Sequence, residues 1–111
     1  MIEFKVETTS RGIGVVTPVG RLNMVSARRL GEVVTELVGA GTNRIVVDMA
    51  QTDFMDSSGL GALIAGLKTT RQAGGDLRLA CPTEQIQTVL ELTNLNKVLR
   101  PRPTVEGAFD A

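Results

Sequence analysis

The spacing of apolar residues at the start of the chain predicts a β-hairpin. Apolar and charged side chains alternate over residues 2–7, which is the period of a strand buried on one face. Residues 10–12 read Ser-Arg-Gly, a sequence that favours a turn, and an apolar run at residues 13–19 follows it. Two antiparallel strands joined by this turn are therefore expected.

The apolar period then lengthens to that of a helix over residues 27–39. Its apolar side chains fall on one face, and its charged side chains lie elsewhere. We predict that Ser26 is the N-cap of this helix and that Val25 and Leu30 occupy the two positions of a hydrophobic staple. Glycines at its far end offer places for the helix to stop.

The next part of the chain alternates strand and helix patterns. Ile45-Val46-Val47 is a continuous β-branched run, typical of a central strand that is covered on both faces. The pattern further predicts a helix over residues 58–73, a short strand over residues 77–81, and another helix that begins at Pro82-Thr83. The inner face of that last helix is predicted to carry Ile86, Val89, Leu90 and Thr93.

The C-terminal region carries weaker signals. Residues 94–99 are expected to add one more helical turn. Pro101 and Pro103 each lack a backbone N–H, so their segment is at most an edge strand. Thr104 is predicted to cap a last short helical piece that runs through Phe109.

The order of these elements indicates an α/β fold in a single domain over residues 1–111. We expect a mixed sheet of about four strands covered by three to four helices, with right-handed crossovers. The loops before the first two helices leave the carboxyl ends of strands that should be parallel neighbours. This topology would bring Asn23 and Ser57 close together.

Composition narrows the classes of function. Twelve Lys and Arg balance twelve Asp and Glu, so the basic excess of a nucleic-acid-binding protein is missing. The chain has no histidine and one cysteine, Cys81, expected to be a small buried residue, which argues against a metal cluster and favours a reducing cytoplasm. The longest nearly apolar run, residues 59–67, is far shorter than the roughly 20 residues that span a bilayer. We expect a cytoplasmic protein with no metal, cofactor, direct nucleic-acid contact or membrane segment.

The most informative motif is Asp56-Ser57-Ser58-Gly59-Leu60-Gly61, at a predicted junction between a strand and a helix. Helix capping alone would explain Asp and Ser at such a place. Catalysis by Ser57 fits poorly, because the chain offers no histidine base and Lys68 lies about 16 Å away along a helix. Position 55 is also Met, where a nucleophile elbow needs Gly.

Other catalytic chemistries are no better supported. Asp48, Asp53 and Asp56 show no spacing that assigns a general acid and a base, and Gly59-Leu60-Gly61 lacks the Gly-Lys-Ser/Thr ending of a phosphate loop. A helix N-terminus favours negative charge, so Ser57 is better suited to receiving a phosphate than to attacking a substrate. The sequence therefore predicts a switch rather than an enzyme.

Several segments, taken in order, carry a resemblance to a known family. They are Gly20-Arg21-Leu22-Asn23, Ile45-Val46-Val47-Asp48, residues 54–61, Gly75-Asp76-Leu77-Arg78-Leu79 and residues 89–95. This order resembles a STAS domain, and more narrowly a bacterial anti-sigma factor antagonist. The resemblance covers almost the whole chain and ends in residues 103–108, which are similar to the closing helix of the family.

The resemblance implies that Ser57 is phosphorylated by a partner that is both an anti-sigma factor and an ATP-dependent serine kinase. The unmodified protein would bind this kinase and free the sigma factor, phosphorylation would release it, and a serine phosphatase would reset it. In this interpretation Asp56 orients the loop or the kinase. Ser58 is a second hydroxyl, for which capping the helix is a sufficient structural role, so Ser57 is favoured over Ser58 as the modified residue. The expected partner-binding surface consists of Asn23, Met24, Asp56, Ser58 and Gly59. For Met24, exposure as a partner contact and ordinary burial in the loop are equally expected.

Two positions depart from the family pattern. The family commonly has acidic residues where this chain has Asn23 and Arg21, so the identity of the partner stays open. Domains of this type also occur in stressosome scaffolds and in lipid-transport accessory proteins, which makes a non-switching interaction module the first alternative function. A sensor of a small ligand or nucleotide is the second.

Overall fold

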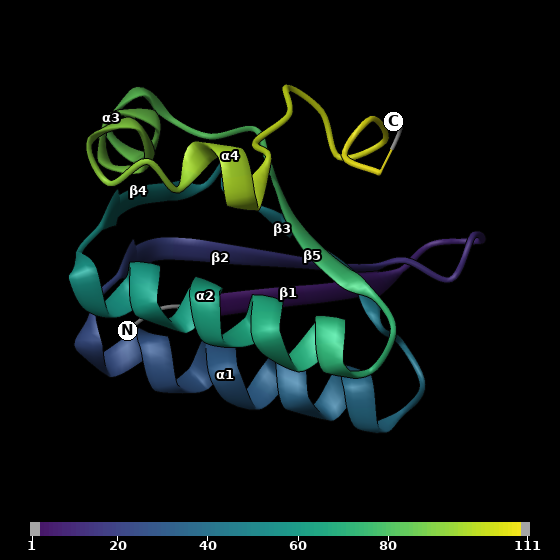
Figure 1. Cartoon of the computed structure of the whole chain (residues 1–111). Coiled ribbons are helices and arrows are strands. Elements are labelled where there is room, and N and C mark those ends of the chain that lie inside the picture. Colours follow the sequence, from purple (N-terminus) through teal and green to yellow (C-terminus); the bar gives the residue numbers. More distant parts are fainter. Residues whose placement is uncertain (1–2, 110–111) are drawn as a thin grey trace.

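A mixed sheet with helices packed against it makes up the computed structural model, which describes residues 3–109 (Figure 1). In that range the strands are β1 (Glu3–Thr8), β2 (Gly14–Leu22), β3 (Arg44–Asp48), β4 (Thr52–Met55) and β5 (Asp76–Ala80). The helices are α1 (Met24–Gly39), α2 (Ser57–Gln72), α3 (Glu84–Leu92) and α4 (Asn96–Leu99). The predicted α/β fold is confirmed.

The sheet runs in the order β1-β2-β3-β5, with β4 paired to β2. β1 and β2 form the predicted antiparallel hairpin, while every other pairing is parallel. β2 pairs with β3 near its start and with β4 at its end, and its register shifts between Gly20 and Arg21. Gly20 has a φ of 113°, a conformation that glycine adopts without steric cost. This irregularity lies where β2 begins to pair with the strand that leads into α2.

β4 is the strand that the sequence pattern did not predict. It has only four residues, Thr-Asp-Phe-Met, so it offers too few alternations to be recognised by its period. With β4 the sheet has five strands in the described part of the chain, where about four were expected.

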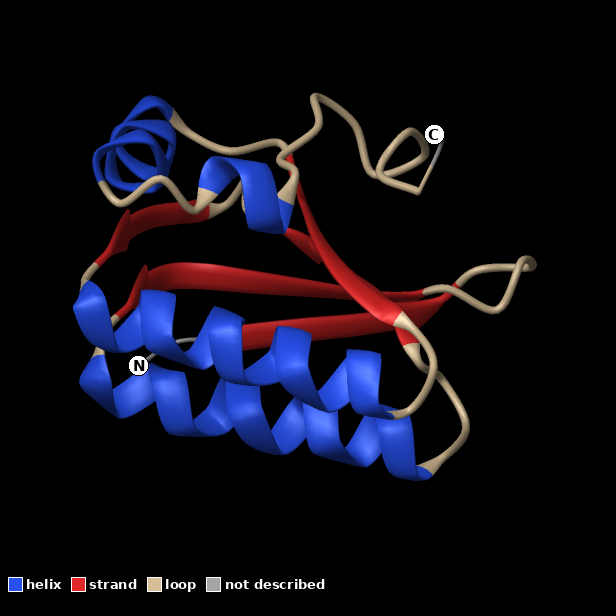
Figure 2. Cartoon of the chain, viewed as in Figure 1, coloured by secondary structure: helices blue, strands red, loops and turns tan. Residues whose placement is uncertain are grey.

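The core lies between the sheet and the helices. Ile45, Val46 and Val47 of β3 are all completely buried, as their β-branched run predicts for a central strand. α1 and α2 lie side by side along one face of the sheet (Figure 2). Val46 contributes to a second cluster, with Ile13, Ala80 and Ala108, under the C-terminal segment.

The C-terminal half follows the sequence prediction except at two places. Thr83 caps α3, and Ile86 and Leu90 are fully buried, as expected. Thr93 is exposed instead of facing inward, because the helix ends at Leu92 and the Thr93 hydroxyl donates to Val89 O at 2.8 Å.

The segment after α4 forms a bridge and a turn. Arg102 makes a single parallel bridge with Ala80, consistent with the expected limit of an edge strand. The predicted helical piece from Thr104 to Phe109 is wrong: the residues form a turn, in which Thr104 Oγ1 accepts from Gly107 N at 3.0 Å. Glycine within so short a segment lowers its helix propensity. No helix in the described part of the chain is long and apolar enough to span a membrane.

Candidate functional site

Two helices begin at the same edge of the sheet. The last residue of β2, Leu22, is paired with the last residue of β4, Met55, and the Asp56 N–H donates to Leu22 O at 3.3 Å. Asn23 and Asp56 follow these paired residues and are the N-caps of α1 and α2. As the sequence predicts, the loops before the two helices are therefore neighbours, and both helix N-termini lie at one end of the molecule (Figure 1).

The N-terminus of α1 corrects the predicted cap. Asn23, and not Ser26, is the N-cap: its Oδ1 accepts from Val25 N at 3.1 Å and from Ser26 N at 3.3 Å. Ser26 is the third helical residue and its hydroxyl accepts from Asn23 N at 2.9 Å, which completes a capping box. The helix consequently begins at Met24, three residues earlier than the apolar period indicated.

This earlier start leaves two apolar side chains on the surface. Met24 is 74% exposed and Val25 is 82% exposed. The predicted staple between Val25 and Leu30 is wrong, because Leu30 is fully buried while Val25 points into solvent. An exposed Met24 was one of two equal expectations for that residue.

Asp56 caps α2 through a carboxylate oxygen that accepts from Gly59 N at 3.0 Å. The cap is therefore Asp56 and not Ser58, which is half-buried as the second residue of the helix. Ser57 is the first helical residue and is exposed. The first turn of α2 itself contains no acidic side chain, so the carboxylate at this end of the helix is that of the cap, Asp56.

Gly59 lies beneath the expected partner-binding surface, of which the sequence analysis made it a part. It is buried, and a Cβ atom at this position would overlap the carbonyl oxygen of Leu22 and come within 2.9 Å of Leu22 Cγ. The absence of a side chain lets the first turn of α2 approach β2. Gly59 therefore supports the candidate surface and does not form part of its exposed face.

Two contacts at this edge escaped the sequence analysis. The Arg21 guanidinium carbon lies 4.4 Å from the centroid of the Phe54 ring, across the pair β2–β4. The Gln85 side chain of α3 hydrogen-bonds both the N–H and the carbonyl of Met55. A cross-strand pair cannot be recognised until both strands are known, and no pattern in the sequence distinguishes Gln85 from the other polar residues of its helix.

The described residues hold no cluster of three or more His, Cys, Asp and Glu side chains suited to a metal ion. Cys81 is only partly buried, not fully as expected, and its thiol donates to Pro103 O at 3.3 Å. Burial raises the pKa of the Cys81 thiol, and the nearby Asp48 carboxylate raises it further. A thiol with a raised pKa is a poor nucleophile at neutral pH.

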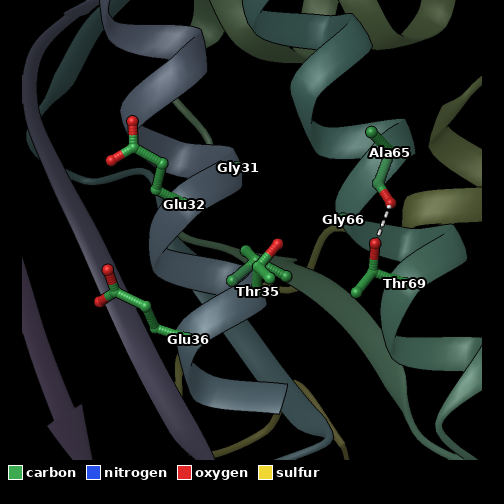
Figure 3. Close-up of a pocket in the computed structure, with 8 residues that line it drawn as sticks. Gly31, Glu32, Thr35, Glu36, Ala65, Gly66 and Thr69 are labelled. Atoms are coloured by element: carbon green, nitrogen blue, oxygen red, sulfur yellow. Dashed lines mark hydrogen bonds between the residues drawn. The ribbon is translucent and has the colours of Figure 1, made fainter. Parts of the chain in front are cut away.

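A shallow groove of about 490 Å³ lies between α1 and α2, away from the capping loops (Figure 3). Glu32 and Glu36 lie on its α1 side, and the Thr69 hydroxyl on α2 donates to Ala65 O at 3.0 Å. A Cβ atom on Gly66 would lie 3.0 Å from Leu77 Cδ1, so the absence of a side chain at this position permits close packing of α2 against β5.

Known proteins share the sequence pattern and the fold of this chain. The family model described as STAS domain matches residues 5–108. The chain is 30% identical over 80 residues to an anti-sigma-B factor antagonist from Staphylococcus aureus, covering 72% of this chain and 74% of that protein. The crystal structure of a candidate anti-sigma factor antagonist from Thermotoga maritima matches with a TM-score of 0.88 and 26% identity, over 96% of this chain and 92% of that one.

A further likeness is to the fold alone. The structure of the Bacillus cell fate determinant SpoIIAA in its phosphorylated form matches with a TM-score of 0.76 and 22% identity, over 97% of each chain.

Proposed function

Because the chain belongs to the STAS domain family, we propose that it is an anti-sigma factor antagonist whose binding is switched by phosphorylation of Ser57. The unmodified protein binds an anti-sigma factor that is also an ATP-dependent serine kinase, and this binding frees a sigma factor. Phosphorylated protein leaves the kinase until a serine phosphatase restores it. The protein acts in the cytoplasm as a binding partner, without catalysis and without direct contact with DNA.

The exposure of Ser57 at the first position of α2 is the observation that carries this proposal. A kinase needs access to the hydroxyl, and the position supplies it. The first N–H groups of a helix have few partners within the helix, and the helix dipole favours an anion there. A phosphate on Ser57 therefore fits the local backbone.

The surroundings of Ser57 supply a surface for a protein partner. Met24 and Val25 are exposed apolar side chains on the neighbouring helix N-terminus, next to the half-buried Asn23. Apolar side chains that become buried at the centre of an interface contribute strongly to affinity. Together with Asp56 and Ser58, they form the surface that we assign to the kinase.

Phosphorylation changes the charge of this surface more than its shape. A phosphoserine carries about −1.5 to −2 charges at pH 7. If the interface buries that charge without a cation, a penalty of about 3 to 4 kcal/mol weakens binding by a few hundredfold, since 1.4 kcal/mol is tenfold. Such a loss is sufficient for the partner to be exchanged.

The test combines mass spectrometry and binding with the cognate kinase. Incubation with kinase and ATP is expected to add one phosphate to the wild-type protein, located on Ser57 by peptide mapping. Ser57→Ala should bind the kinase persistently and accept no phosphate, while Ser57→Asp should bind weakly. Ser58→Ala removes the neighbouring hydroxyl and should still accept one phosphate, on Ser57.

Three results would contradict the proposal. They are the absence of modification by a kinase that demonstrably binds the protein, modification confined to Ser58, and equal kinase affinity of Ser57→Ala and Ser57→Asp. A non-switching scaffold would show no kinase-dependent exchange and would form stable oligomers in size-exclusion chromatography. A ligand sensor would instead bind a nucleotide or small molecule in the absence of any kinase.

A further inference from the structure

The side-chain amide of Gln85 holds the backbone of Met55 at both of its polar groups. Oε1 of Gln85 accepts from Met55 N at 3.2 Å, and Nε2 donates to Met55 O, also at 3.2 Å. A neighbouring strand would satisfy a β-strand residue in the same way, by one donor and one acceptor. The Gln85 amide, which comes from α3, therefore gives the end of β4 the two hydrogen bonds that a further strand would give it. We call this pair of hydrogen bonds the Gln85 clamp.

Met55 lies two residues before Ser57, the proposed phosphorylation site. Its side chain is 1% exposed, and the next residue, Asp56, is both the N-cap of α2 and the donor to Leu22 O. Two consecutive residues before Ser57 are therefore fixed from different elements, Met55 from α3 and Asp56 from β2. Without the amide of Gln85, both polar groups of Met55 would lose these partners, which is costly for a part-buried backbone.

Docking of α3 does not depend on this amide. Ile86 and Leu90 are completely buried and belong to the main core cluster, so they anchor the helix against the sheet. Half-buried Gln85 lies at the start of the helix and adds hydrogen bonds to the backbone of β4. Its geometry is therefore specific to the segment that leads into Ser57.

We propose that Gln85 is a positioning residue that fixes the Met55–Asp56 segment in the conformation in which Ser57 is offered to the kinase. This inference rests on the proposed function of Ser57. Glutamine suits the role because it combines an acceptor and a donor on one planar group. Glutamate at position 85 would retain the acceptor for Met55 N but would lack a donor for Met55 O.

The experiment measures two properties separately: the strength of the Gln85 clamp on Met55, and the efficiency with which the kinase phosphorylates Ser57. Amide hydrogen exchange reports the protection of Met55 N–H, and steady-state kinetics with the cognate kinase report kcat/KM for phosphorylation. Gln85→Ala should accelerate exchange at Met55 by about tenfold and lower kcat/KM severalfold, because the segment is no longer preorganised. Gln85→Glu, with one of the two hydrogen bonds, should lie between Gln85→Ala and wild type.

Two control variants separate positioning from general stability. Gln87→Ala removes an exposed glutamine of the same helix and should leave both measurements unchanged. Ile86→Val weakens the packing of α3 but keeps the Gln85 amide, so its thermal midpoint should fall while kcat/KM stays near the wild-type value. A purely structural role of Gln85 would instead make kcat/KM follow the midpoint in all variants.

Each outcome bears on a different part of the inference. Unchanged exchange at Met55 in Gln85→Ala would overturn the clamp itself. Faster exchange with unchanged kcat/KM would overturn the role in presenting Ser57. If a kinase that binds the wild-type protein leaves Ser57 unmodified, the proposed function and the presentation role fall together, while exchange at Met55 still decides the clamp.

Discussion

At the scale of single residues, two polar caps determine where α1 and α2 begin. Asp56 caps α2 with a carboxylate, and Asn23 caps α1 with an amide oxygen that accepts from Val25 N and Ser26 N. Asn and Asp are comparable N-caps. An asparagine at position 23 therefore keeps the cap that an acidic residue would provide and removes only its negative charge. A partner that docks here meets a surface with one negative charge fewer than an aspartate would give it.

Cys81 supports a prediction about pH and reactivity. Its pKa is raised, first by burial and then by the Asp48 carboxylate, so at a given pH a smaller fraction of the thiol is ionised than in a free cysteine. Since the thiolate is the reacting species, alkylation by iodoacetamide at pH 8 should be slower in the folded protein than in the same protein unfolded in guanidinium chloride. Measured against pH, the rate of the folded protein should reach its plateau at a higher pH.

An Asp48→Asn variant tests the cause of this shift. Its amide oxygen can still accept from Ala50 N, as the Asp48 carboxylate does at 3.0 Å, but the charge is gone. The rate profile should move part of the way toward the unfolded protein, since burial still acts. A profile for wild type that reaches its plateau at or below the pH found for the unfolded chain would show that the pKa is not raised.

At the scale of elements, two glycines of α2 should respond in opposite ways to alanine. A Cβ atom on Gly59 would overlap the Leu22 carbonyl and approach Met55 Cγ to 3.0 Å, whereas a Cβ atom on Gly61 has nothing within 4 Å. Gly59→Ala should lower the free energy of unfolding by about 2 kcal/mol or more, because the backbone of β2 cannot move away from the new methyl group without breaking its strand pairing. Gly61→Ala should raise it by about 0.5–1 kcal/mol through helix propensity.

Urea denaturation of the two variants and the wild type measures this difference. The two substitutions are chemically identical and lie two residues apart in one helix, so each serves as the control for the other. Equal stabilities would show that α2 does not approach β2 as closely as the structure indicates.

Sequence patterns predict elements better than they predict ends. α1 and α2 were recognised from their helical periods, and β2 and β3 from continuous apolar runs, because burial sets both patterns along several residues. The start of α1 was misplaced because Met24 and Val25 are apolar but exposed, so the apolar period begins later than the helix does. The end of a helix is set by the hydrogen bonds of a few residues, here those of Asn23, and these leave little trace in hydropathy.

At the scale of the whole molecule, the site depends on pairings between segments that are distant in the sequence. The parallel arrangement correctly predicted that the loops before α1 and α2 meet at one edge. It did not reveal that β4 is the strand beside the end of β2, nor that α3 reaches that strand through Gln85. Such contacts join residues about 30 positions apart and depend on which strands become neighbours, which a local pattern does not record.

The same arrangement predicts that phosphorylation leaves the fold intact. An anion at the N-terminus of a helix contributes about 0.3–1 kcal/mol, and repulsion from the neighbouring Asp56 carboxylate offsets part of it. A change of 1 kcal/mol shifts Tm by about 4 °C in a domain of this size. The Tm of protein phosphorylated on Ser57 should therefore lie within about 4 °C of the unmodified protein, with an unchanged far-ultraviolet circular dichroism spectrum.

Calorimetry of both forms, with kinase-treated Ser57→Ala as the control, checks this expectation. Ser57 is exposed and the first turn of α2 carries no acidic residue, so the phosphate meets solvent and helical N–H groups and not the core. In the proposed switch, the partner is then lost because the interface must bury a new charge, and not because the protein unfolds. A fall in Tm of more than about 10 °C would reverse that conclusion, because release of the kinase would then follow from disruption of the α2 N-terminus and of the strands packed beneath it.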